Sequence, residues 1–305
     1  MLNRRILRIK AFKAVYALAE NPAMTTAEAL DNLESSCQAT RDLYLFMLAL
    51  IPALTAEAAS RLAAAQAKFN PTEEERHPNF KFVHNGIAPL LEEDPDFQKI
   101  IKKKQLSWDQ YDVFLRHLYD TLKASDYFAE YMASDTASLE EDARLFVTIY
   151  ERELVDNTEL EEILEDLSIW WNDDLAYSLT YCCHAVNDLA AGKRWAMPEL
   201  YLSQMPGQNR KESDRDFVRS VVSEAVRSFS ASVESISALT PKWDKNRICT
   251  TDLALIVCGM AEAAACPQTA PRIIMNEYVE ISKFFSTSAS SAFVNGLLDK
   301  LINKQ

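Results

Sequence analysis

Glycine is scarce in this 305-residue sequence, which contains only 5 glycines, whereas an average protein has about 7%. The glycines are scattered and do not separate short alternating segments, as they do in a protein built from β-hairpins. No GxSxG motif, no P-loop and no other glycine-rich turn that could hold a nucleotide phosphate occurs. Few glycines together with 48% apolar residues favour long helices around a substantial core.

Cysteine and histidine also lack the spacings typical of metal sites and of nucleophiles. The 6 cysteines lie on mostly apolar stretches without a CxxC pair, which predicts reduced core thiols. His84, His117 and His184 are far apart in the sequence. A di-metal carboxylate bundle needs ExxH pairs on facing helices, but the only such spacing, Glu74 to His77, lies in an expected loop. We therefore predict no metal, no cofactor and no enzymatic activity.

Long apolar runs are missing as well. We find no run of the roughly 18 apolar residues that a membrane span needs. The first residues mix basic with apolar side chains, whereas a signal peptide has an uninterrupted apolar stretch. These observations predict a cytoplasmic protein that does not contact the membrane.

The net charge of −13 is unevenly distributed. Five basic residues precede the first acidic residue, Glu20, and the rest of the chain carries −18. The five are Arg4, Arg5, Arg8, Lys10 and Lys13. A body this acidic repels phosphate and attracts basic proteins, so any contact with nucleic acid should be local or should involve a basic partner.

Apolar residues at spacings of three and four predict helices over most of the chain. The expected helices cover 4–20, two segments of 25–68 that are broken near Pro52, the segments 108–132, 139–155 and 159–191, and then 213–239, 250–265, 271–285 and 289–303. The polar stretch 203–213 marks the main boundary. The sequence therefore predicts an all-α protein with an N-terminal helical region over 1–205 and a compact helical core over 206–305.

The last hundred residues carry the most specific pattern. In PRIIMNEYVEISKFF, Ile274, Tyr278 and Ile281 recur at the spacing of a buried helical stripe. In SSAFVNGLLDKL, Gly296 lies inside an expected helix, where glycine costs about 1 kcal/mol relative to alanine. Such a glycine is typical of a close approach between backbones.

These residues resemble the NusB family of bacterial transcription antitermination factors. Four pieces match in order: Arg215-Asp216-Phe217, opening a helix that ends near Trp243-Asp244; the helix from Asp252 to Glu262; the run from Pro271 to Phe285; and Phe293-Val294-Asn295-Gly296-Leu297-Leu298-Asp299. The first helix is similar to the arginine-rich opening of the family, which leads into an apolar stretch ending in tyrosine, here Val15-Tyr16.

The resemblance implies an all-helical protein of two packed helical subdomains. It also implies pairing with a small-subunit ribosomal protein, NusE, and binding of boxA-type single-stranded RNA, so that the transcription elongation complex reads through ribosomal RNA operons. The RNA contacts that it implies are Arg4, Arg5 and Arg8, with Lys10 and Lys13 as additions. The residues expected to meet the partner protein are Tyr16, Glu262 and Glu280. The signature positions expected to fix packing and caps are Asn276, Glu277, Phe293, Asn295 and Gly296.

The sequence also departs from the family. The usual member is less than half this length, and residues 21–205 have no clear counterpart. Val257 stands where the family has a basic residue, and Ser288 to Ala292 replace a charged stretch. The chain therefore looks like a long version with an inserted helical region, and part of the usual RNA surface is altered.

Two alternatives remain open. The acidic region could make the protein a scaffold for a basic partner without direct RNA binding. The same helical domain also precedes ribosomal RNA cytosine methyltransferases, but no Rossmann segment and no Pro-Cys pair follow here. For the leading hypothesis, replacing Arg4, Arg5 and Arg8 with glutamate is predicted to weaken RNA binding without unfolding the protein.

Overall fold

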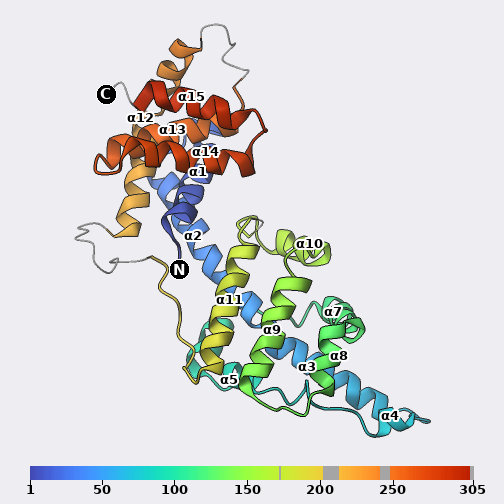
Figure 1. Cartoon of the computed structure of the whole chain (residues 1–305). Helices are drawn as coiled ribbons and strands as arrows, with labels where there is room; N and C mark the ends of the chain where they lie inside the picture. The colour runs from blue at the N-terminus through green and yellow to red at the C-terminus, as the bar shows by residue number, and fades with distance from the viewer. Residues whose placement is uncertain (172, 202–212, 241–247, 303–305) are drawn as a thin grey trace. The chain divides into compact units, whose positions relative to one another are not determined.

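The computed structural model describes residues 1–171, 173–201, 213–240 and 248–302, and every regular element in these ranges is a helix (Figure 1). This confirms the predicted all-α class. One isolated parallel β-bridge joins Leu2 to Tyr201. Most of the polar stretch 203–213, and the Trp243-Asp244 pair, lie outside the described residues.

The chain divides into two compact units. The first, here called the split unit, combines Met1–Gln38 with Glu199–Gln305, and the second, here called the inserted unit, is Ala39–Pro198. The sequence boundary near 205 lies close to one of these limits. The first helix, however, is in the same unit as the C-terminal helices and not in the N-terminal region where the sequence pattern placed it.

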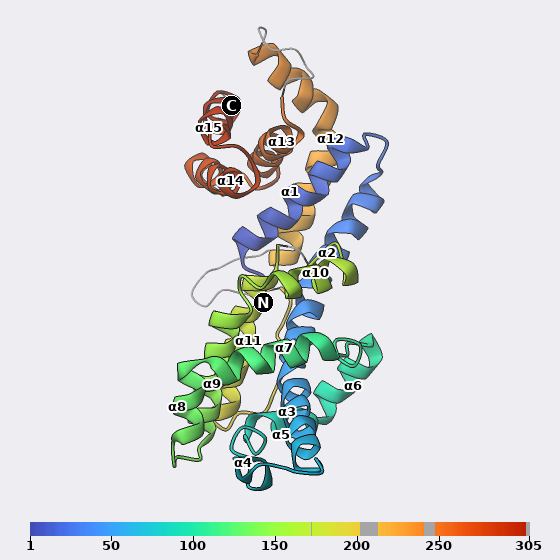
Figure 2. The ribbon, with the colours of Figure 1, turned by 90° about the vertical axis from the view of Figure 1, so that its right-hand side faces the viewer.

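The split unit is arranged around one central helix. Its helices are α1 (Arg4–Glu20), the first part of α2 (Thr26–Leu48), α12 (Asp214–Leu239), α13 (Thr250–Ala265), α14 (Pro271–Phe285) and α15 (Ser290–Ile302). α13 contacts α1, α12, α14 and α15. Five successive residues of α13, from Ala254 to Cys258, are buried, as expected for a helix that is apolar on all sides. Figure 2 shows α13, α14 and α15 nearly end-on beside α1 and α12.

The inserted unit contains the other helices. They are the second part of α2, α3 (Leu50–Gln66), α4 (Glu73–Arg76), α5 (Ile87–Glu92), α6 (Pro95–Lys104), α7 (Asp112–Ala124), α8 (Asp126–Ala133), α9 (Leu139–Glu153), α10 (Thr158–Leu167) and α11 (Leu175–Ala190). Aromatic rings fill its core: Phe46 and Trp108 stack with ring centroids 4.2 Å apart. Trp108 Nε1 donates to the carbonyl oxygen of Phe46 at 2.9 Å. The buried indole therefore keeps its hydrogen bond, as large amphipathic rings in cores usually do.

Several helix limits agree with the sequence pattern and two do not. The expected break near Pro52 is confirmed, because α2 ends at Leu48 and α3 begins at Leu50. Pro52 is the third residue of α3, where a backbone N–H has no partner within the helix. The expected helix 159–191 is instead two helices, α10 and α11, and the segment 108–132 contains α7 and α8. Ser125 separates the latter pair because its backbone is extended.

One helical run is more apolar than the sequence analysis allowed. α2 and α3 together form a 41-residue stretch, Thr26–Gln66, which by length and by a mean hydropathy of 1.6 could cross a membrane. However, 61% of its most apolar window is buried inside the protein. Core packing therefore accounts for this hydrophobicity.

The acidity of the chain belongs to one unit. The inserted unit has 15 lysines and arginines against 29 aspartates and glutamates, a net charge of −14. The split unit has 17 basic against 16 acidic residues, a net charge of +1. Repulsion of phosphate is therefore a property of the inserted unit, and the split unit is close to neutral.

Candidate nucleic-acid interface

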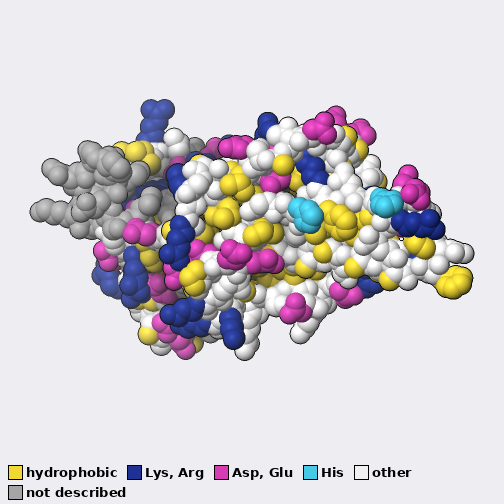
Figure 3. Space-filling view, turned by 90° about the horizontal axis from the view of Figure 1, so that it is seen from below, with side chains coloured by type: hydrophobic (Ala, Val, Ile, Leu, Met, Phe, Trp, Pro, Cys, Tyr) yellow, Lys and Arg dark blue, Asp and Glu magenta, His cyan; other side chains and the backbone are white. Residues whose placement is uncertain are grey.

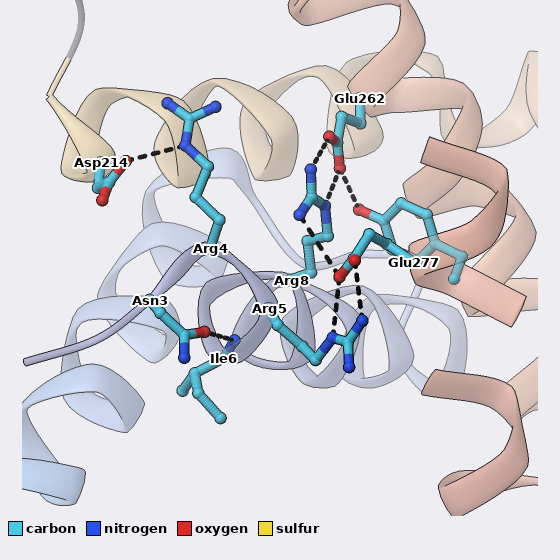
Figure 4. Close-up of polar contacts among 9 residues, drawn as sticks. Asn3, Arg4, Arg5, Ile6, Arg8, Asp214, Glu262 and Glu277 are labelled. Carbon is cyan, nitrogen blue, oxygen red and sulfur yellow. Dashed lines mark hydrogen bonds and ion pairs between the residues drawn. The ribbon is translucent and has the colours of Figure 1, made fainter. Parts of the chain in front are cut away.

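The candidate interface is built on α1, whose first five residues contain three arginines and no acidic residue. Asn3 caps the helix, since its side-chain oxygen accepts a hydrogen bond from the backbone N–H of Ile6 at 3.0 Å. Cations at this end oppose the helix dipole at a cost of about 0.3–1 kcal/mol each. The arginines must therefore be stabilised by groups on other elements, and Figure 4 shows that each has a carboxylate partner.

Arg4 is tied to α12. Its Nε donates to Asp214 Oδ1 at 2.9 Å, and its guanidinium carbon lies 4.2 Å from the centre of the Phe217 ring. Asp214 is in the first turn of α12, where a negative charge is favoured by the dipole of that helix. The Arg4 side chain is 17% exposed. Most of it is therefore engaged within the split unit.

Arg5 remains at the surface although it is paired. Its Nε and Nη2 donate to the two carboxylate oxygens of Glu277 on α14, at 3.0 and 2.9 Å (Figure 4). The Arg5 side chain is 54% exposed, against 20% for Glu277. The hydrogen bonds from Arg5 lower the pKa of Glu277 below its usual range. Arg5 therefore presents a positive charge to solvent while it joins α1 to α14.

Arg8 is buried and forms the centre of a polar network. Its Nε and Nη2 donate to the two carboxylate oxygens of Glu262 on α13, at 2.8 and 2.6 Å. Tyr278 on α14 donates its hydroxyl to the same carboxylate at 3.0 Å. Burial raises the pKa of Tyr278 well above its usual range, which keeps this hydroxyl protonated as a donor. Arg8 thus joins three helices of the split unit.

Burial overturns part of the predicted RNA surface. Arg8 is 5% exposed and Lys10 is fully buried, so neither side chain can reach a phosphate group outside the folded unit. Lys13 is half-buried, with its Nζ 6.0 Å from the centre of the Phe285 ring. Of the five basic residues, only Arg5 is exposed.

The residues expected to meet a partner protein also differ in their exposure to solvent. Tyr16 is 39% exposed, and its ring makes an edge contact with Phe12. Glu280 is half-exposed and pairs with Lys283 on the same helix. Glu262 is fully buried and holds Arg8, so the expected contact with a partner is wrong and its role is structural.

The signature residues of the C-terminal helices have different environments. Glu277 pairs with Arg5 and so joins α14 to α1, as expected for a residue that fixes helix packing. Phe293 is half-buried. Asn276, Asn295 and Gly296, in contrast, are exposed.

The glycine that allows close packing is Gly259 and not Gly296. A Cβ atom built on Gly296 meets nothing within 4 Å, which overturns the expected close approach at that position within the folded unit. A Cβ atom on Gly259 in α13 would lie 2.7 Å from Leu298 Cδ2 and 3.4 Å from the ring of Tyr278. Gly259 was not predicted as a packing residue, although its place in an apolar helix is a usable signal.

Replacing Gly296 with alanine is expected to stabilise the protein by about 0.5–1 kcal/mol, because alanine has the higher helix propensity and the added methyl group meets open space. Thermal unfolding followed by circular dichroism measures this gain. An unchanged or lower melting temperature contradicts the prediction. If the Gly296→Ala variant is more stable but binds its partners less well, the glycine serves an approach by another molecule.

A hydroxyl cluster lies in the connection between α14 and α15. Asp252 at the start of α13 accepts hydrogen bonds from Ser286 Oγ at 2.6 Å and from Ser290 Oγ at 2.9 Å. These bonds fix the turn between α14 and α15 to α13. The serines of this segment therefore have a packing role that their sequence pattern did not reveal.

Comparison with known proteins shows similarity for the C-terminal part of the chain. Residues 185–303 match the model of the NusB family. The transcription antitermination protein NusB of Finegoldia magna is 29% identical over 98 residues, which are 32% of this chain and 72% of that protein. The NusB proteins of Chloroherpeton thalassium and Methylacidiphilum infernorum are each 30% identical, over 30% of this chain and 43% and 64% of their own lengths. No solved structure matches.

The match begins after α1, but the fold brings α1 to the matched helices. α1 contacts α12, α13 and α14, all of which lie within residues 185–303. The arginine contacts described above form at these helix pairs. The domain therefore draws its first helix from residues that the family match does not cover.

Proposed function

We propose, from the NusB family domain that residues 185–303 form, that this chain is a transcription antitermination factor. It binds boxA-type RNA together with NusE and promotes read-through of ribosomal RNA operons in the cytoplasm. The observation that carries the proposal is the packing of the arginine-rich α1 against the matched helices. This arrangement supplies a basic helix to a domain that is similar to transcription antitermination proteins.

Arg5 is the principal RNA contact in this proposal. Its guanidinium has five N–H donors in a planar fork, and Glu277 engages Nε and Nη2. The remaining N–H groups are able to donate to a phosphate oxygen without loss of the pair. Lys13 lies two helical turns further along α1, on the same face as Arg5, and provides a second cation. Arg4 contributes less because it is largely engaged by Asp214.

The buried cations act indirectly. Arg8 and Lys10 hold α1 in place and do not touch RNA. Tyr16 and Glu280, which reach the surface, are the candidates for contact with NusE. A basic partner also offsets the charge of −14 on the inserted unit, which on its own weakens RNA binding.

Replacing Arg5 with alanine is expected to weaken binding of boxA-type RNA about tenfold and to lower the salt dependence by about one unit of slope, because one phosphate contact is lost. Fluorescence anisotropy of labelled RNA in the presence of NusE, across a salt series, measures both effects. Stability should change by less than about 1 kcal/mol, since the Arg5–Glu277 pair is exposed.

A matched control is Arg227→Ala. Arg227 is an exposed arginine on α12 whose partner is Glu224, so this variant removes the same charge and also breaks an ion pair. The account expects almost unchanged RNA binding for Arg227→Ala. Equal losses in the two variants would show that general charge, and not the α1 surface, determines the affinity.

A further inference from the structure

The inserted unit concentrates its negative charge in one segment. Residues 151–174 contain ten aspartates and glutamates and a single basic residue, Arg152, a net charge of −9. This segment thus carries most of the −14 of the whole unit. It includes the end of α9, all of α10 and the connection into α11.

A groove lies between this segment and the start of α11. Its volume is 450 Å³, and its apolar lining consists of Val155, Leu164, Leu175 and Ala176. Leu164 and Leu175 are buried residues of the core, whereas Val155 and Ala176 are exposed. The volume is within the range of about 300–1,000 Å³ that ligand pockets span.

Three carboxylates surround the apolar lining. They belong to Glu161 and Glu165 on α10 and to Asp173 before α11. Glu161 and Glu165 are exposed and four residues apart on one helix, where like charges repel each other. Neither glutamate forms an ion pair within the described part of the chain. Both carboxylates therefore remain exposed to solvent and can pair with a basic group from another molecule.

Exposed apolar residues continue beyond the groove. Leu167, the last residue of α10, is 42% exposed, and Ile169, in the turn that follows, is 77% exposed. Hydrophobic side chains are visible among charged ones on the face that Figure 3 draws, so exposure alone does not mark a site. Here, however, Leu167 and Ile169 follow the groove residues Leu164 and Glu165 within a few residues of the sequence.

We propose that this groove binds a lysine- and arginine-rich segment of a partner protein. One apolar side chain of that segment enters the groove against Leu164 and Leu175, and its basic side chains pair with Glu161, Glu165 and Asp173. Charge complementarity selects this occupant: nucleic acid and a second copy of this acidic unit are both repelled. The described residues contain no group of three ligands that could hold a metal ion, which argues against a cation site.

The proposal is independent of RNA binding by the split unit. It assigns a function to the inserted unit, for which the NusB family match gives none up to residue 184. A chain with both sites can bind RNA through one unit and a basic protein through the other. If the experiment on one site gives a negative result, the other site can still be tested.

The test uses the full chain and a fluorescein-labelled amphipathic peptide with lysines and arginines on one face and leucines on the other. The variant Glu161→Gln/Glu165→Gln is expected to bind the peptide at least tenfold more weakly. The matched control Glu74→Gln/Asp109→Asn removes two exposed charges from the same unit but outside the groove, and should change the affinity by less than twofold. Equal losses in both double variants would overturn the proposal in favour of non-specific attraction.

A second variant tests the apolar part without altering charge. Ala176→Phe places a ring in the groove from an exposed position on α11 and is expected to abolish peptide binding while helix content is retained. Zero-length carbodiimide crosslinking should join peptide lysines to Glu161, Glu165 or Asp173, as identified by mass spectrometry. Unchanged binding by Ala176→Phe, or crosslinks only to other carboxylates, would overturn the proposal.

Discussion

Replacing Arg8 with methionine is expected to lower the free energy of unfolding of the split unit by about 3–5 kcal/mol, the cost of leaving a buried charge without its partner. Glu262 is fully buried, and after the substitution the Tyr278 hydroxyl is the one remaining hydrogen-bond donor to its carboxylate among the described residues. Hydrogen exchange of α13 and α14 peptides in increasing urea, read by mass spectrometry, measures this loss in the unit concerned.

Two further variants separate the buried pair from general effects. Arg5→Met breaks an exposed pair and should cost only about 0.2–1 kcal/mol. Arg8→Met combined with Glu262→Met removes both charges and should recover much of the loss, because two apolar side chains replace the pair. A loss for Arg8→Met no larger than that for Arg5→Met would contradict the structural role of the network.

This result also changes the interpretation of the arginine-rich helix. Replacing Arg4, Arg5 and Arg8 together with glutamate would place a second carboxylate beside the buried Glu262. We therefore expect that triple variant to unfold the split unit, contrary to the expectation from the sequence. Of the three arginines, Arg5 is the one suited to a test of RNA binding in a folded protein.

Replacing Gly259 with valine is the second change with a large expected effect, a loss of about 1–3 kcal/mol from overpacking. The added Cβ atom would lie 2.7 and 3.2 Å from the two methyl groups of Leu298, and the branched methyl groups would come closer still. Urea unfolding with the same hydrogen-exchange readout gives the size of the effect.

A size exchange tests the cause of this loss. Leu298→Ala alone should cost about 2–5 kcal/mol because it leaves a cavity at a fully buried position. Combined with Gly259→Val, it provides room for the new side chain. The stability loss of the double variant should therefore be smaller than the sum of the losses of the two single variants. Fully additive losses would show that the contact between α13 and α15 is not what requires glycine.

The sequence predicted the helices of the split unit closely. α1, α13 and α14 begin and end where caps, prolines and apolar spacing placed them: Asn21 follows α1, and Pro271 opens α14. These signals are local, so they act without tertiary contacts. The breaks at Ser125 and between α10 and α11 were missed because apolar spacing continues across both and no proline or glycine marks them.

The division into units could not be read from local patterns. Packing of α1 against helices more than two hundred residues later depends on contacts such as Arg5–Glu277, whose partners are adjacent only in the fold. The same limit applies to the site. A run of arginines indicates a basic surface, but burial decides that Arg8 is a core residue while Arg5 faces solvent.

Binding of a labelled boxA-type single-stranded RNA to the full chain, with and without purified NusE across a salt series, tests the central claim most directly. The account predicts tight binding that requires NusE, weakens with salt and is reduced in the Arg5→Ala variant. Absence of RNA binding under both conditions would contradict it and would favour a protein that acts through its acidic unit alone.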